Sequence, residues 1–215
     1  MYFLNTNLFA ASAVALALCG PARADQVFNG VTYAQLKSVV THMGVETQER
    51  TTNQGNKYIL VHVPNSNITF ASTTASCPNG QNIACLGFAN FVVLDGSLSD
   101  TNRFNQSNQF LKAYPASSAA NTIFTLESFA IGGVTDLNVA SAAGYFANFV
   151  KAMTSKTSSA EPAKPTAPSF TSLAKAQAFF ADLAKQSLST TGKAPAPNAE
   201  SMGAFADYLN GAKAK

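Results

Sequence analysis

The residues of this chain best equipped for chemistry are its cysteines, Cys19, Cys77 and Cys85. The segment Pro78–Asn82 contains a Pro and an Asn-Gly pair, which favour a turn that brings Cys77 and Cys85 together. A disulfide there would stabilise the fold by about 2.5 kcal/mol in the chain-entropy model. Two free thiols or two metal ligands are the alternatives. However, C-x7-C is not metal-ligand or redox C-x-x-C spacing, so we predict a structural disulfide.

The two histidines and eleven acidic residues do not form a recognisable catalytic arrangement. We expect His42 near the end of a helix and His62 inside a strand, where structural roles are usual. The acidic residues stand singly, without a pair of carboxylates for general acid–base catalysis. No G-x-S-x-G, P-loop, H-E-x-x-H or G-x-G-x-x-G motif occurs. The sequence therefore predicts no catalytic residue, no metal ligand and no cofactor, and it favours a protein that is not an enzyme.

A group of polar side chains stands just before Pro115. Apolar residues recur there at steps of three and four, so we expect a helix over Asp100–Tyr114 that Pro115 ends. Amides in the first turns of this helix could cap or cross-link neighbouring loops. With the nearby Arg and Tyr they could instead line a ligand or peptide groove. On that second interpretation the candidate binding residues are Asn102, Arg103, Asn105 and Tyr114.

Residues 1–24 are typical of a signal peptide. Leu8–Leu18 is an apolar run too short to span a bilayer, and the A-R-A triplet before Asp25 offers a cleavage site. The segment lacks an N-terminal Lys or Arg, and Cys19 raises a lipoprotein alternative, although Leu18 is not the small residue that lipidation needs. We predict cleavage after Ala24 and a periplasmic or extracellular protein without an integral membrane segment. Such compartments are oxidising, which suits the disulfide.

Composition and charge narrow the classes of function. Hydrophobic residues make up 47% of the chain and charged residues 12%, which suits a globular rather than a disordered protein. The net charge of +3 is too small for an electrostatic nucleic-acid footprint, so we expect no nucleic-acid partner. Residues 25–153 hold six basic and seven acidic side chains, whereas 154–215 hold seven and four. The basic character is thus concentrated in the C-terminal part.

Hydrophobic periodicity predicts an α+β domain over residues 25–153, with helices packed on one face of a meandering antiparallel sheet. Thr32 and Gln35 form a capping box at the start of the first helix. The expected helices are 32–43, 100–114 and 136–153, and the expected strands are 45–52, 57–63, 68–72, 86–94 and 122–131.

Composition changes at residue 154. Residues 154–168 are rich in Pro, Ala and Ser, which is typical of a linker. Residues 169–215 contain two amphipathic segments, which predict a helical hairpin. Two helices bury little apolar surface by themselves, so the hairpin must dock on the domain or on a partner.

Three passages carry a family resemblance: Asn102–Asn105 with Phe110–Tyr114, Gly132–Thr135, and Cys77–Phe88. They resemble the YbjN-domain family, whose members are described as bacterial sensory transduction regulators. The first is similar to the family signature N-x-W-N…r-a-Y, although Phe104 stands in place of Trp and Pro115 in place of an acidic residue. The second is the Gly-Gly-Val-Thr turn before the last helix of the domain, and the third is the cysteine loop with the strand that follows it.

The resemblance covers about residues 30–153. It implies a fold similar to type III secretion chaperones, which are compact α+β modules that often dimerise and bind other polypeptides, and it carries over no catalytic residue. We therefore expect a secreted, non-enzymatic binding or regulatory module with a protein partner, with a homodimer as one expected assembly. A structural cell-envelope protein anchored through its basic C-terminal helices is the alternative. A hydrolase or transferase with an unrecognised site is the third hypothesis.

Overall fold

The computed structural model describes residues 27, 29–95, 98–116, 121–154, 167–187 and 199–210. The predicted signal peptide and residues 155–166 of the predicted linker lie outside this part of the chain. In sequence order the elements are α1 (Tyr33–His42), β1 (Glu46–Thr51), β2 (Lys57–His62), β3 (Thr69–Ala75), β4 (Gly87–Asp95), α2 (Leu98–Ser107), β5 (Leu111–Pro115), β6 (Asn121–Phe129), α3 (Asp136–Thr154), α4 (Leu173–Ser187) and α5 (Ala199–Leu209).

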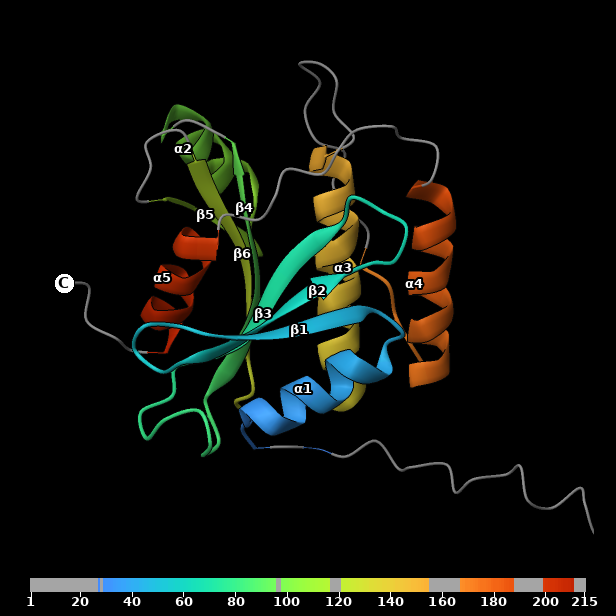
Figure 1. The fold of residues 1–215 in the computed structure, drawn as a ribbon, viewed down its shortest axis with the longest axis horizontal. Coiled ribbons are helices and arrows are strands. Elements are labelled where there is room, and N and C mark those ends of the chain that lie inside the picture. Colours follow the sequence, from blue (N-terminus) through green and yellow to red (C-terminus); the bar gives the residue numbers. More distant parts are fainter. Residues whose placement is uncertain are drawn as a thin grey trace, which may run out of the picture.

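The strands form one six-stranded antiparallel sheet with the order β1-β2-β3-β4-β6-β5 (Figure 1). The first four strands meander, and the fully exposed β1 forms one edge, as its polar sequence predicts. β6 pairs with β4 along nine residue pairs. On its other side β6 pairs with β5, which forms the second edge of the sheet. The α+β class and the antiparallel sheet are confirmed.

Local sequence signals explain where α1 and α3 begin. Thr32 and Gln35 form the predicted capping box, in which each side chain accepts a hydrogen bond from the other residue's main chain. Before α3, Gly132 and Gly133 both adopt positive φ angles, which glycine tolerates at low cost. Thr135 then accepts a hydrogen bond from the main-chain nitrogen of Asn138. These two helices therefore begin where the sequence predicts.

The predicted helix over Asp100–Tyr114 is wrong in its second half. α2 ends at Ser107, and residues 111–115 form the edge strand β5. Side chains of β5 alternate between buried and more exposed positions, and β6 provides its main-chain partners. On the outer side of β5, Asn105 Nδ2 donates to Ala113 O (2.8 Å) and Ala113 N donates to Asn105 Oδ1 (2.7 Å). The amide thus pairs with the strand edge as a neighbouring strand would, which protects that edge.

The sheet has two covered faces, which we name after the helices that contact them. On the α3 face, the rings of Phe70 and Phe124 contact Phe146 and Phe149 of α3. On the α5 face, the ring of Phe91 contacts Phe205 of α5 at 5.3 Å. Figure 1 shows α5 on one side of the strands and α1, α3 and α4 on the other.

The predictions of helices on one face and of a C-terminal helical hairpin are therefore wrong. α4 packs on the outside of α3, whereas α5 packs on β2, β3 and β4 from the opposite side (Figure 1). The physical reason lies in strands such as β4, whose Phe88 and Phe91 point to opposite faces and are both buried. A sheet that is apolar on both faces needs a cover on each. The division between a 25–153 domain and a separate 169–215 unit stays a prediction.

Candidate functional site

The candidate binding residues from the sequence do not share one surface. Asn102 and Arg103 are exposed on α2, and Asn105 is half-buried at the outer edge of β5, where its amide holds the main chain of Ala113. Tyr114 instead points to the α5 face, where its ring contacts that of Tyr208 on α5. Their roles in binding stay a prediction, and Tyr114 lies beside further polar and aromatic side chains.

On the α5 face, Tyr114 of β5 contacts two further oxygen-bearing side chains, Glu127 of β6 and Tyr208 of α5. The Tyr114 hydroxyl donates to Glu127 Oε1 at 3.4 Å. The ring of Tyr208 lies 6.4 Å from that of Tyr114, and 57% of Tyr208 is exposed. We call Tyr114, Glu127 and Tyr208 the Glu127 site. Neighbouring strands and a helix from the far end of the chain build it, so it exists only in the folded protein.

The Glu127 carboxyl lies in a partly dehydrated environment. Burial raises its pKa, and the hydrogen bond from Tyr114 opposes this increase. Burial also raises the pKa of the Tyr114 hydroxyl, with smaller contributions in the same direction from Glu127 and Tyr208. Among the described residues no salt bridge involves Glu127. The site therefore holds a half-buried acidic group without a basic partner in this part of the chain.

Aromatic rings form the floor beside the Glu127 site. The ring of Phe205 lies 5.5 Å from that of Tyr114, 5.7 Å from that of Tyr208 and 5.3 Å from that of Phe91. Because Phe91 is on β4 and Tyr114 on β5, Phe205 spans β6, which runs between them. Thr125 is the β6 residue paired with Phe91, and its buried hydroxyl has no hydrogen-bond partner in the described structure. The helix α5 thus covers this polar group without satisfying it.

Polar contacts fix the position of α5 and hence of Tyr208. The carboxylate of Asp207 accepts hydrogen bonds from Thr52 Oγ1 (2.5 Å) and Asn56 Nδ2 (2.8 Å) in the turn between β1 and β2. One residue beyond Tyr208, the Leu209 carbonyl oxygen accepts from Ser76 N at 2.7 Å. These contacts on both sides of Tyr208 hold its backbone, while its side chain points out toward Tyr114.

The predicted disulfide is present and lies close to this end of α5. Cys77 and Cys85 are bonded and link the end of β3 to the start of β4. Ser76, which holds Leu209, directly precedes Cys77. The bridge therefore braces the turn against which the C-terminal end of α5 packs.

The histidines lie apart from the Glu127 site. His42 Nδ1 donates to the main-chain oxygen of Ser38 at 2.6 Å, and His62 Nδ1 lies 2.9 Å from Thr69 Oγ1. Both contacts are local, as expected for structural histidines. Within the described ranges, no group of three His, Cys, Asp or Glu residues is arranged to hold a metal ion.

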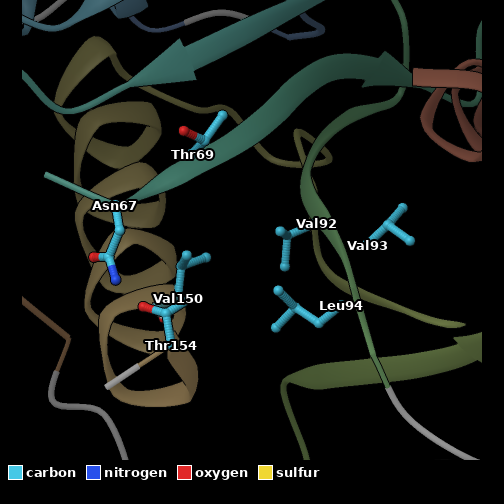
Figure 2. A pocket seen from close by; sticks show the side chains of 7 residues that line it. All are labelled: Asn67, Thr69, Val92, Val93, Leu94, Val150 and Thr154. Carbon is cyan, nitrogen blue, oxygen red and sulfur yellow. The ribbon is translucent and has the colours of Figure 1, made fainter. Parts of the chain in front are cut away.

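A second candidate location is a shallow pocket of about 280 Å³, part of it open solvent, between β3, β4 and α3 (Figure 2). It lies where β3 and β4 diverge, because their pairing ends at Ala71 and Phe91. Apolar and small polar side chains line it without an ionisable group: Asn67, Thr69, Val92, Val93, Leu94, Val150 and Thr154. This composition offers little for specific recognition, so the Glu127 site remains the better candidate.

Sequence reasoning missed Glu127 and Tyr208. Glu127 is the one charged residue of β6, a strand that otherwise consists of apolar, hydroxyl and amide side chains, and a carboxylate there is a usable signal. Tyr208 has no comparable signal, because its neighbourhood depends on the face to which α5 docks.

Comparison with family models, with curated proteins and with solved structures found no match to this chain. Among the residues that the structure describes, none of the helices combines the length and apolar character needed to cross a bilayer.

Proposed function

We propose that this protein is a secreted, non-enzymatic binding module that engages a protein partner through the surface around the Glu127 site. The observation that carries the proposal is the contact of Tyr114 with both Glu127 and Tyr208, beside the ring of Phe205. Aromatic residues are enriched at protein interfaces, and a few polar groups among them fix the partner's orientation. The two histidines lie elsewhere in local contacts, which supports binding rather than catalysis.

The proposal includes a regulatory role in sensory transduction and a fold similar to that of type III secretion chaperones. The resemblance of residues 30–153 to the YbjN-domain family supports both, and the α+β architecture is compatible with them. The disulfide and the sequence of residues 1–24 support a periplasmic or extracellular location. Homodimer formation is part of the same proposal, and light scattering of the mature protein measures it. An envelope anchor made of the C-terminal helices has less support, because the apolar residues of α5 are buried against the sheet.

Affinity capture with site variants tests the proposal. The mature protein, Tyr208→Ala and Glu127→Gln are each used to isolate partners from the periplasmic fraction of the source organism. Two matched controls remove an exposed carboxylate and an exposed apolar side chain elsewhere, Glu46→Gln on β1 and Ile83→Ala in the cysteine loop. We expect one protein to be captured by the parent and both controls and lost with the site variants. Equal capture by all five proteins would refute the proposed surface.

A further inference from the structure

We propose that the Glu127 site binds the ammonium or guanidinium group of a basic side chain on the partner protein. This inference rests on the proposed function and names the chemistry that the site recognises. It starts from a mismatch: the Glu127 carboxyl is half-buried, yet no basic side chain in the described structure pairs with it. Partly dehydrated carboxylates gain more from a cation than solvated ones, because water screens the attraction less.

Lys112, a basic residue of the described structure on the strand next to β6, is turned elsewhere. Lys112 on β5 pairs with Thr125, two positions before Glu127 on the same face of β6. Its ammonium group donates to the main-chain oxygen of Asn108 at 3.5 Å, on the α2 side of the strand. Within the described ranges, the carboxylate therefore has no basic side chain paired with it.

The hydrogen-bonding groups of the site suit such a cation. Two phenol oxygens and a carboxylate are all able to accept hydrogen bonds, and ammonium and guanidinium groups carry only donors. The rings of Tyr114 and Tyr208 add faces that attract a cation electrostatically. An anionic ligand would instead be repelled by Glu127. The stem of a Lys or Arg side chain can pack on the exposed ring of Tyr208, which an inorganic cation could not do.

The test uses small probes on the full mature chain, so it does not need the partner. Butylguanidinium and butylammonium chloride are titrated against the labelled protein and followed by NMR, at constant ionic strength. Butylurea, which has a similar shape and no charge, is the control ligand. We expect saturable shifts at Tyr114, Glu127 and Tyr208 with both cations and none with butylurea. Glu127→Gln should weaken binding about tenfold, as expected for the loss of a charge-assisted hydrogen bond.

Two comparisons keep the result decisive. Glu127→Gln preserves the shape of the side chain, so its NMR spectrum reports whether the fold is intact, and Glu46→Gln should leave binding unchanged. Equal responses to butylurea and the cations, or unchanged binding in Glu127→Gln, would overturn the inference. Cation binding without any site-dependent protein capture would sustain this site while removing the proposed function. Site-dependent capture of a protein without cation binding would support the proposed function and overturn the inference of a cation site.

Discussion

The two faces of the sheet are covered by different kinds of contact. On the α3 face, Phe146 touches both Phe70 and Phe149, and all three rings are fully buried. On the α5 face, a polar anchor at Asp207 holds the helix, and Tyr114 remains only half-buried beside a carboxyl group. The first face is packed like an ordinary protein interior. Each face leaves one buried polar atom of a strand without a hydrogen-bond partner in the described structure, Asn90 Nδ2 on the α3 face and Thr125 Oγ1 on the α5 face. The second face also holds the half-buried carboxyl of Glu127, so we expect it to contribute less to stability, and it is the face that we propose for recognition.

The largest expected effect is a difference in the free energy of unfolding between two variants, each of which removes one aromatic ring from one face. Phe146→Ala should lower the free energy of unfolding by about 3–5 kcal/mol, because it opens a cavity in a core that cannot collapse. Phe205→Ala should cost less, because α5 can detach locally and limit the loss. Urea denaturation measures both values, and hydrogen exchange shows whether α5 opens alone. Equal losses in the two variants would mean that the faces are equivalent parts of one core.

Removal of the Cys77–Cys85 disulfide tests how strongly the position of α5 depends on this bridge. Replacing Cys77 and Cys85 together by Ala should lower the free energy of unfolding by about 2.5 kcal/mol through the gain in unfolded-chain entropy. Because Ser76 holds Leu209 next to the bridge, amide exchange should rise in α5 more than in α3. Uniform acceleration of exchange across both helices would contradict a local bracing role.

Two threonines of β6 provide a matched pair on opposite faces. Thr125 on the α5 face has a buried hydroxyl without a partner, whereas the buried Thr122 hydroxyl lies 3.1 Å from Thr101 Oγ1. Replacing Thr125 by Val should stabilise the protein by about 1 kcal/mol, because an unsatisfied buried polar group is removed. Thr122→Val should destabilise it by about 1 kcal/mol, since the hydrogen bond between the Thr122 and Thr101 hydroxyls is lost. Thermal unfolding measures both, and a loss of stability in Thr125→Val would show that its hydroxyl is satisfied.

The smallest effect is a pH dependence confined to the α5 face. The pKa of Glu127 is raised in the folded state above its usual value of 4.5, so the folded protein binds more protons between the two values. Its contribution to stability therefore falls as the pH rises from 4.5 through the folded-state pKa. Glu127→Gln should be more stable than the parent above this window and equal to it below pH 4.5.

Urea midpoints of both proteins across this range provide the measurement. The pKa of Glu49 on β1 is lowered, chiefly by its hydrogen bond from Lys37, and gives the opposite slope. That contribution is common to both proteins and cancels in their difference. A constant difference at every pH would mean that Glu127 does not titrate abnormally.

Local physics explains what could be predicted from the sequence. The capping box at Thr32, the glycine turn before α3 and the Cys77–Cys85 bridge each involve residues close together in the chain. The strands of the β1–β4 meander follow from periodicity and short turns for the same reason. In these cases a few neighbouring side chains decide the conformation, whatever the rest of the molecule does.

Tertiary structure decided the remainder. Residues 111–115 fit a helical or a strand pattern, and the pairing with β6 and with the Asn105 amide selected the strand. The placement of α5 depended on which sheet face still needed a cover, and it brought Tyr208 beside Tyr114 and Glu127. Burial is a property of the whole assembly, so a short apolar segment does not specify the surface that it will meet. The Glu127 site joins residues far apart in the chain, and only the packing of α5 on the sheet creates it.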